Sequence, residues 1–536
     1  MLMHFPQRAK LAARLKRLAL PALLALVYLP ALGSSSSGTH PDESYYLGIS
    51  AEMDANGAWL TPTIDGQARW FKPPLLYWAE RICYAAFGRG FFGGRFPAAL
   101  SAIALALATG SLAARLYGEQ ARVRAALLVA TTFGFVKFGR IAMMDAPMAL
   151  AFTAAAYGAW RASEEGRPSQ LLLVGLSAGA AFLLKGPVGA VLVLLIAGGF
   201  LALRRRELLA SRYTAGAFAL GAVVGLPWYL VSLAVHGKRF FHFFFVEQNL
   251  DRFQHPWTLG GEATLVFGFL AFLLPWTFIV LGALLTRGYL RRPELLLPTV
   301  WILSVLLVFT LPSLKWPHYG LACTPAAALL ASRADPPRWA RLLTAGVLGG
   351  LAILLLGGLL LRPPLLAAAG LLAACATLLA AGALVARSRI AAGATALALS
   401  YAVVLGVVVP KVNPPVIPAA ALAAMRGRDL FVYGYVPGIF TLAAGRPVHR
   451  VEGPAIEKAL EEGGVVIFPD KDLESLPEEL RQKLTPVARW EHVPGYLPTS
   501  AVWHSLSCRD PSFLFEPMWA MVLPRPGPLS TRTGRP

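Results

Sequence analysis

The chain has 536 residues, of which 56% are hydrophobic and only 15% are charged, and its mean hydropathy is +0.57. Soluble domains carry about 25% charged residues, so this composition excludes an ordinary soluble protein and indicates an integral membrane protein. The 49 Lys and Arg residues outnumber the 29 Asp and Glu residues, which gives a net charge of +20. Membrane topology explains this excess without nucleic acid, because cytoplasmic loops are rich in Lys and Arg.

Apolar segments close to the length of a spanning helix, about 20 residues, recur between charge clusters. We predict thirteen spans, with cores at residues 15–33, 96–116, 125–138, 148–160, 171–184, 188–203, 215–235, 263–285, 295–311, 319–330, 343–361, 365–385 and 390–409. Lys and Arg are most frequent in the N-terminal tail and in alternate loops, which predicts a cytoplasmic N-terminus and an outer C-terminal region. The basic and then apolar N-terminus also resembles a signal peptide, and its cleavage stays open.

Two regions interrupt the hydrophobic pattern. Residues 34–95 mix acids, bases and aromatics, and we expect them to form an outer loop with helices along the membrane surface, where Tyr and Trp prefer to lie. In residues 411–510, four strand-like segments ("DLFVYGY", "PVHRV", "VVIFPD" and "VARWEHV") alternate with helical ones, which predicts a small α/β domain. Residues 511–536, rich in Pro, Gly and Arg, are predicted to be disordered.

The predicted fold is therefore a polytopic α-helical membrane protein with juxtamembrane helices and a small C-terminal α/β domain. Residues 1–410 form the membrane domain in this prediction, and the two outer regions lie on one side of the bilayer. The four cysteines show no spacing typical of disulfides or metal sites.

Cations at the predicted outer ends of helices are informative, because topology gives no reason for them there. Lys72, Lys185 and Lys315 are each followed within two residues by a proline, which ends a helix and would hold the cation in a fixed turn. Several cations around one cavity suit a phosphate, since opposite charges about 4 Å apart attract by about 4 kcal/mol at an effective dielectric near 20. The alternative is that each lysine extends to the interface without a specific role.

Asp42 and Glu43 ("PDESYY") follow the first apolar segment. One interpretation is a solvated turn that caps the next helix. Beside a cationic pocket, however, a carboxylate can accept the proton of an attacking hydroxyl, a role worth about 10² to 10⁴ in rate. Asp145 could hold a lysine or orient the acceptor. These residues together favour group transfer from a phosphate leaving group at the outer membrane face.

An ordered series of motifs resembles a known superfamily. "DESYYLGISAEM", "WFKPPLLYW", "GRIAMMDAPMA", "LLKGPVG", "VEQNLDRF" and "LKWPHYG" resemble motifs of the GT-C type glycosyltransferases, in the branch of the protein O-mannosyltransferases and the lipid A aminoarabinose transferases. The resemblance implies a polyprenyl (undecaprenyl) phosphate sugar donor and an inverting transfer at the periplasmic face of a bacterial inner membrane. The sugar stays open, and so does the acceptor, which is a lipid, a glycan or a protein.

The resemblance also implies roles for individual residues, with Asp42 as the catalytic carboxylate and Glu43 and Asp145 beside it. The predicted substrate-binding residues are Lys72, Lys185, Lys315, Tyr319, His318, Tyr46, Arg140, Glu247, Asn249 and Arg252. The aminoarabinose transferases carry an arginine where this chain has Tyr45 and a glutamate where it has Phe71. The second departure removes a candidate metal ligand in the outer loop. We commit to no cofactor, and a divalent metal stays open without support from the residues.

Two other classes of protein compete with an enzyme. A flippase or transporter for lipid-linked sugars would also need cations, but such proteins place binding residues near mid-membrane, within repeats. Here the charges lie at helix ends and no repeat is visible. A receptor or scaffold that acts through its soluble domain would leave the outer lysines unexplained.

Overall fold

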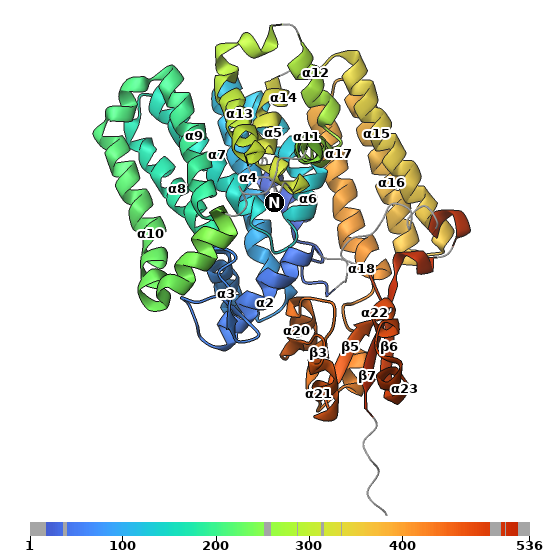
Figure 1. Cartoon of the computed structure of the whole chain (residues 1–536). Coiled ribbons are helices and arrows are strands. Elements are labelled where there is room, and N and C mark those ends of the chain that lie inside the picture. Colours follow the sequence, from blue (N-terminus) through green and yellow to red (C-terminus); the bar gives the residue numbers. More distant parts are fainter. Residues whose placement is uncertain are drawn as a thin grey trace, which may run out of the picture.

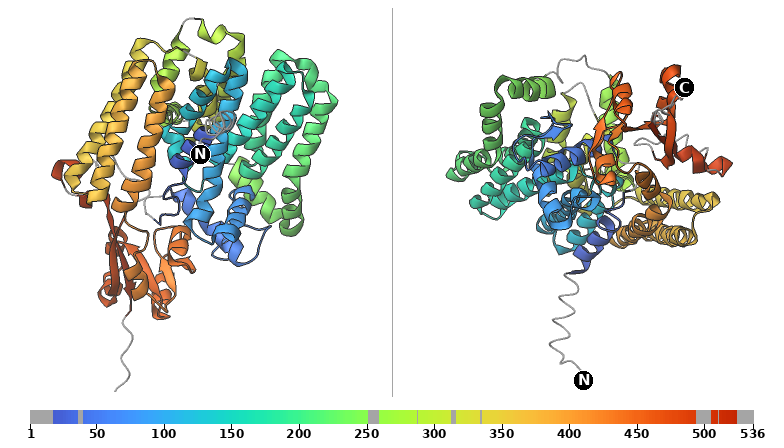
Figure 2. Two further views of the ribbon diagram at one scale, coloured as in Figure 1. Left: turned by 180° about the vertical axis from the view of Figure 1, so that it is seen from behind. Right: turned by 90° about the horizontal axis from the view of Figure 1, so that it is seen from below.

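The structure is a computed structural model, and it describes residues 18–35, 40–250, 259–286, 288–311, 316–333, 335–493, 505–509 and 511–523. A large helical body carries a small domain with a β-sheet at one end (Figure 1). Views from behind and from below show the same division, with the sheet beside the end of the body that holds α2 and α3 (Figure 2). The functional site lies at this end.

The helical body begins with a short apolar helix, Leu18–Tyr28. The following helices are α2 (Pro41–Ala55), α3 (Leu75–Phe87), α4 (Phe91–Tyr117), α5 (Glu119–Ala130), α6 (Phe133–Phe138), α7 (Asp145–Glu164), α8 (Leu171–Lys185), α9 (Pro187–Arg204), α10 (Arg212–Phe241), α11 (Leu259–Phe272), α12 (Thr277–Leu285), α13 (Leu296–Thr310), α14 (Thr324–Arg333), α15 (Arg338–Gly357), α16 (Leu365–Ala386), α17 (Ile390–Val403) and α18 (Val409–Val412). A two-stranded antiparallel hairpin, β1 (Thr63–Ile64) and β2 (Gln67–Ala68), lies between α2 and α3.

In the described part of the chain, eight helices are long and apolar enough to cross a membrane. A ninth is counted if α11 and α12, which are bent by 110° relative to each other, form one broken span. The predicted number of thirteen exceeds this count because several predicted spans coincide with short helices, such as α5 and α14. The coarser prediction of a multi-pass helical membrane protein is confirmed.

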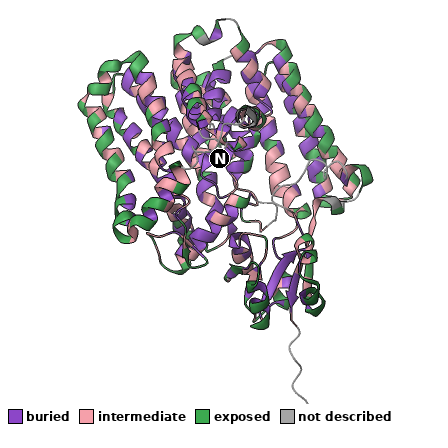
Figure 3. Ribbon diagram, in the orientation of Figure 1, coloured by how far each residue is buried: buried purple, intermediate pink, exposed green. Residues whose placement is uncertain are grey.

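The outer helices carry many exposed residues (Figure 3), and several of these are large and apolar. Val223 on α10, Ile353 on α15 and Leu365 on α16 are 71%, 70% and 88% exposed. A soluble protein rarely leaves such a continuous apolar surface in water, whereas lipid tails are a matching solvent for it. The exposed faces of these helices therefore fit contact with lipid.

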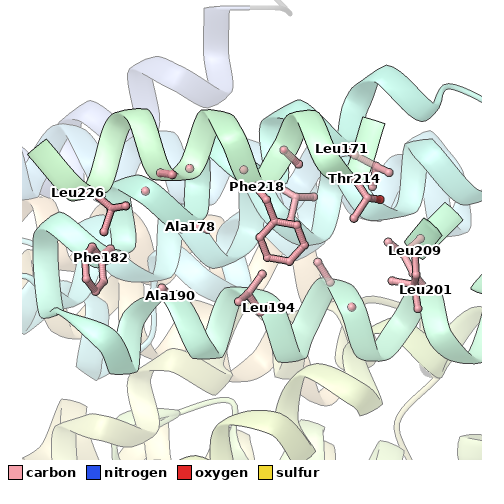
Figure 4. Close-up of a pocket in the computed structure, with 18 residues that line it drawn as sticks. Leu171, Ala178, Phe182, Ala190, Leu194, Leu201, Leu209, Thr214, Phe218 and Leu226 are labelled. Atoms are coloured by element: carbon pink, nitrogen blue, oxygen red, sulfur yellow. The ribbon is translucent and has the colours of Figure 1, made fainter. Parts of the chain in front are cut away.

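An apolar cleft of about 400 Å³ lies between α8, α9 and α10 (Figure 4). Thr214 is the only one of its lining residues with a polar side chain. Glycines allow the helices to approach closely here, because a Cβ on Gly179 would lie 2.8 Å from the carbonyl oxygen of Gly221. Small residues at helix contacts are typical of membrane proteins.

The sheet domain follows the last long helices. Its elements are α19 (Ala419–Ala424), β3 (Leu430–Val432), α20 (Gly438–Ala444), β4 (Val448–Arg450), α21 (Ala455–Glu461), β5 (Val465–Pro469), α22 (Asp470–Glu474), α23 (Glu478–Lys483), β6 (Thr485–His492) and β7 (Glu516–Val522). The strand order is β4-β3-β5-β7-β6, in which β4, β3 and β5 are parallel and β7 runs antiparallel to both of its neighbours. The four segments predicted as strands coincide with β3, β4, β5 and β6.

The prediction of a disordered tail from residue 511 is wrong for β7. This strand pairs with β5 on one side and β6 on the other, so both edges of its backbone are hydrogen-bonded. Its Met518 and Ala520 are fully buried. The short apolar run "MWAMVL" is surrounded by prolines, and the tail's overall composition concealed it.

The sheet domain packs directly on α2. Leu47 and Ala51 of α2 belong to the same buried cluster as Ile439 and Phe440 of α20. The face of α2 that carries Leu47 and Ala51 is therefore part of the core of the sheet domain. The opposite face of α2 is turned toward the helical body.

Candidate functional site

A cavity of about 310 Å³ lies where α2 faces the helical body. Its lining comes from α2, the turn before α3, the start of α7, the end of α8, the segment after α10 and the 3-10 helix Pro317–Cys323. The lining residues are Asp42, Tyr45, Tyr46, Ile49, Phe71, Lys72, Met143, Met144, Asp145, Lys185, Gln248, Trp316, His318 and Tyr319. The fold thus gathers seven of the predicted site residues, which are far apart in the sequence, around one space.

Both carboxylates of the cavity lie at helix N-termini. Asp42 is in the first turn of α2 and Asp145 is the first residue of α7. A helix N-terminus carries partial positive charge and stabilises a nearby carboxylate by about 0.3 to 1 kcal/mol. The side chain of Asp42 is 45% exposed, whereas Asp145 is 9% exposed. Asp42 is therefore the carboxylate with more room for a bound molecule.

His40 closes the N-terminus of α2. Its Nδ1 accepts a hydrogen bond of 3.2 Å from the backbone N–H of Asp42. Only an unprotonated ring nitrogen can accept, and burial lowers the pKa of His40 below its usual value of 6.5. The neutral imidazole therefore caps the helix and fixes the backbone of Asp42.

Lys185 is the last residue of α8, where Gly186 (φ +72°) breaks the helix and Pro187 starts α9. This is the local turn that the proline after the lysine predicts. The Nζ atom lies 4.6 Å from the ring centre of Tyr319 and 5.9 Å from that of Phe309. Aromatic faces attract an ammonium group by about 0.5 to 2 kcal/mol without neutralising it. Lys185 is thus held in place with its charge available to an anion.

Aromatic rings form much of the remaining wall. The ring centroid of His318 lies 5.8 Å from that of His40 and 5.1 Å from that of Tyr319. The rings of Tyr45 and Phe71, the two positions where the sequence resemblance implied a departure, contact each other with centroids 5.8 Å apart. Apolar and aromatic walls with a few convergent polar groups are typical of ligand sites.

Glu43 does not line the cavity, contrary to its predicted catalytic role. Its side chain is 0% exposed and accepts hydrogen bonds from Arg95 Nε at 2.7 Å and from the backbone N–H of Ala142 at 3.0 Å. Arg95 also donates to the carbonyl oxygens of Leu32 and Ser34. The adjacent carboxylates diverge because Asp42 faces the cavity, while Glu43 joins α2 to α4 and to the segment before α7.

Three further predicted binding residues lie away from the cavity wall. Arg140 donates to the carbonyl oxygens of Val27 and Pro30, at 2.9 and 2.6 Å, which satisfies the end of the first helix. Glu247 contacts His242, and the amide of Asn249 donates to the carbonyl oxygen of Phe244. Lys315 and Arg252 lie outside the described residues.

Gln248 lines the cavity, whereas the residues predicted from "VEQNL" were its neighbours Glu247 and Asn249. The backbone from His242 to Leu250 is π-helical, and its wider turn changes which side chain faces inward. Trp316, also missed, lies between Lys315 and His318 in the motif "LKWPHYG", so that motif already pointed to it.

The described ranges contain no group of three or more His, Cys, Asp or Glu side chains placed to hold a metal ion. The charged groups that line the cavity within these ranges are two carboxylates, Asp42 and Asp145, and two ammonium groups, Lys72 and Lys185. Such a site can bind an anionic group through the lysines and present a carboxylate to a second molecule.

Comparison with known proteins gives matches in sequence and in structure. Residues 71–230 match the family model "Dolichyl-phosphate-mannose-protein mannosyltransferase". The undecaprenyl phosphate-alpha-4-amino-4-deoxy-L-arabinose arabinosyl transferase 2 of Pseudomonas fluorescens is 33% identical over 362 residues, which are 64% of each chain. The corresponding transferase of Edwardsiella ictaluri is 31% identical over 54% of each chain. These alignments therefore span about half to two thirds of the relatives' length.

The structural match covers more of the chain. The crystal structure of ArnT from Cupriavidus metallidurans bound to undecaprenyl phosphate superposes with a TM-score of 0.72 at 18% identity, over 94% of this chain and 98% of that one. At this identity the match shows the fold alone. The family segment and the relatives that this chain is similar to are glycosyltransferases by name, and its fold is that of ArnT.

Proposed function

We propose that this protein is an inverting glycosyltransferase that moves a sugar from a polyprenyl phosphate, such as undecaprenyl phosphate, to an acceptor. The observation that carries the proposal is the shared cavity of Asp42, Asp145, Lys72 and Lys185. The names of the relatives support a polyprenyl phosphate donor.

In the proposed reaction the bond between the sugar's anomeric carbon and the phosphate oxygen breaks as an acceptor oxygen bonds to the opposite face of that carbon. Lys72 and Lys185 neutralise the charge that develops on the leaving phosphate, and such electrostatic stabilisation is usually a large part of catalysis. Asp42 takes the proton of an acceptor hydroxyl. If the acceptor is itself a phosphate, no proton is removed and Asp42 orients it. Asp145 positions Lys185 or the acceptor.

The proposed membrane arrangement has thirteen spans in the bacterial inner membrane, a cytoplasmic N-terminus and a periplasmic C-terminal α/β domain of residues 411–510. The excess of Lys and Arg in alternate loops supports this orientation. Helix α2, which lines the cavity, lies at the same end of the helical body as the sheet domain (Figure 1), and this supports chemistry at the periplasmic face.

The donor sugar and the acceptor class are left open in this proposal. The relatives are named for an aminoarabinose donor. Tyr45 and Phe71, where the sequence resemblance implies departures from the aminoarabinose transferases, both line the cavity. Site groups that bind a substrate hydroxyl or amine discriminate strongly against analogues that lack it. These two positions are where we expect the sugar preference to differ.

The test uses the full chain in liposomes with a labelled polyprenyl-phosphate sugar and envelope lipids as acceptor. Asp42→Asn is expected to lower the transfer rate by about 10² or more, because it removes the base but keeps the side chain's shape. Donor binding and thermal stability should stay unchanged. The matched control is Asp54→Asn, which alters an acid at the other end of α2 that pairs with Arg89.

Label that reaches a new acceptor supports a transferase, whereas label that only crosses the bilayer supports a flippase. Normal transfer by Asp42→Asn would remove Asp42 from the mechanism. Mass spectrometry of envelope glycolipids and glycoproteins, with and without the protein, then identifies the acceptor.

A further inference from the structure

The two faces of α2 contact different parts of the molecule. Asp42, Tyr45, Tyr46 and Ile49 line the cavity. On the opposite face, residues 44, 47, 48 and 51 lie against the sheet domain. The helix that carries the proposed base is therefore held between the cavity and the C-terminal domain.

Ser44 makes a polar connection between the two parts. Its hydroxyl donates to the carbonyl oxygen of Val436 at 2.8 Å and accepts from the backbone N–H of Ile439 at 3.2 Å. The side chain is 4% exposed, so water does not compete for these bonds. The first turn of α2, two residues beyond Asp42, is thereby joined to the start of α20.

Gly438 brings the two backbones into direct contact. A Cβ placed on Gly438 would lie 2.6 Å from the backbone nitrogen of Gly48 and closer still to the carbonyl oxygen of Ser44. Conversely, a Cβ on Gly48 would lie 3.0 Å from the Cα of Gly438. Real Cβ atoms do not approach backbone atoms so closely. α20 can thus take this position only because residue 438 has no side chain.

We infer that the C-terminal α/β domain positions the catalytic helix, with Ser44 and Gly438 as positioning residues that act through α2 on Asp42. The inference rests on the proposed function. A displacement of about 1 Å at a reacting group can cost about 10²-fold in rate. A helix held on only one face would let Asp42 shift by such a distance, and the sheet domain fixes the second face.

The test compares two variants at the contact with two matched controls in the full chain. Ser44→Ala removes both hydrogen bonds, and Gly438→Ala forces α20 away from α2. Ser50→Ala makes the same change elsewhere on α2, where the buried hydroxyl bonds to Leu47 and Tyr84. Gly464→Ala strains only the sheet domain, because its Cβ would meet Ala459 and Phe431.

We expect kcat for Ser44→Ala and Gly438→Ala to fall about tenfold, while KM for the donor stays within about twofold, since Lys72 and Lys185 are not on α2. Hydrogen exchange of the amides of residues 42–55 should become faster in these two variants. Gly464→Ala should keep the wild-type kcat and the wild-type exchange of α2. Ser50→Ala, which loses a hydrogen bond to α3 and none to the sheet domain, should change both less than Ser44→Ala does.

Equal kcat and equal α2 exchange in all four variants would overturn the inference. The exchange measurement needs no substrate, so it decides whether the domain holds α2 even if the wild-type protein transfers no sugar. A wild-type protein that transfers no sugar would contradict the proposed function. The hydrogen exchange of α2 would then be the measurement that tests whether the sheet domain holds this helix. If Gly438→Ala does not fold, Ser44→Ala still tests the contact, because it removes an oxygen atom and adds no bulk.

Discussion

Two neighbouring residues at the start of α2 show how position decides the role of identical chemical groups. Asp42 has a half-exposed carboxylate at the cavity, and Glu43 has a fully buried one that binds Arg95. A buried charge that loses its partner costs about 3 to 5 kcal/mol, because the remaining charge stays desolvated. In the proposed function, Asp42 therefore serves the reaction, while the adjacent Glu43 holds the site together.

Glu43→Ala is therefore expected to lower the free energy of unfolding by about 3 to 5 kcal/mol, measured by denaturation in detergent micelles. The control is Glu119→Ala. It breaks an Arg–Glu contact of the same 2.7 Å length, but Glu119 is 76% exposed. Such exposed pairs contribute about 0 to 1 kcal/mol. Equal stability of the two variants would contradict a structural role for Glu43.

Among the elements, the break between α8 and α9 has the clearest functional meaning. Gly186 and Pro187 end one helix and start the next, so that Lys185 points into the cavity from a helix C-terminus. A cation at that end is favoured by the helix dipole. A break in a membrane helix thus provides a fixed positive charge at the proposed phosphate position.

Lys185→Met should raise KM for the polyprenyl-phosphate sugar by about 10- to 100-fold, because a charge-assisted hydrogen bond contributes about 1.5 to 3 kcal/mol. Lys185→Arg keeps the charge and should retain part of the affinity. Lys458→Met, on the surface of the sheet domain, is the control and should bind donor normally. An unchanged KM in Lys185→Met would place the phosphate elsewhere.

In the whole molecule, the sheet domain meets the α2–α3 region at two places. Besides the contact at Ser44, His449 of β4 lies with Nδ1 3.3 Å from an Asp65 oxygen at the turn of the β1–β2 hairpin. The backbone N–H of Arg450 donates to the other carboxylate oxygen at 3.3 Å. A cavity of about 580 Å³ lies between these contacts. The domain is thus attached at two separate points.

The contact between His449 and Asp65 should depend on pH. The hydrogen bond to Asp65 raises the pKa of His449 above its usual 6.5, with smaller contributions from the charges of Asp429 and Glu52. A raised folded-state pKa gives stabilisation that is complete below 6.5 and is lost as the pH rises through the folded value. Amides of residues 63–68 should therefore exchange with a lower protection factor at pH 8.5 than at pH 6.5. Protection factors remove the intrinsic pH dependence of exchange.

His449→Gln is expected to abolish this difference in protection. His492 does not disturb the comparison between pH 6.5 and pH 8.5. Burial lowers the pKa of His492 to about 4, so this histidine changes charge only at more acidic pH. Protection that is equal at both values in the wild-type protein would contradict the pH dependence of the contact.

The sequence allowed much of the site to be predicted, because helix ends are marked by proline, glycine and charge. Lys185 and Asp145 were found this way. It singled out Asp42 as the catalytic carboxylate, but it could not show that Glu43 faces away from the cavity, since that depends on Arg95, which is 52 positions away in the chain. Gln248 was missed because the motif resemblance pointed to Glu247 and Asn249 on either side of it, and β7 was missed because its short apolar run lies in a tail rich in Pro, Gly and Arg.

The division of α2 into two faces also bears on how this protein can change its specificity. Residues 42, 45, 46 and 49 follow helical spacing on one side, while residues 44, 48 and 51 occupy the other. A mutation at Tyr45 changes the cavity wall and leaves the domain contact intact. If Asp42 is kept, natural variation or a designer seeking a new donor sugar can therefore change the other cavity-facing positions of the helix while the opposite side preserves the fold.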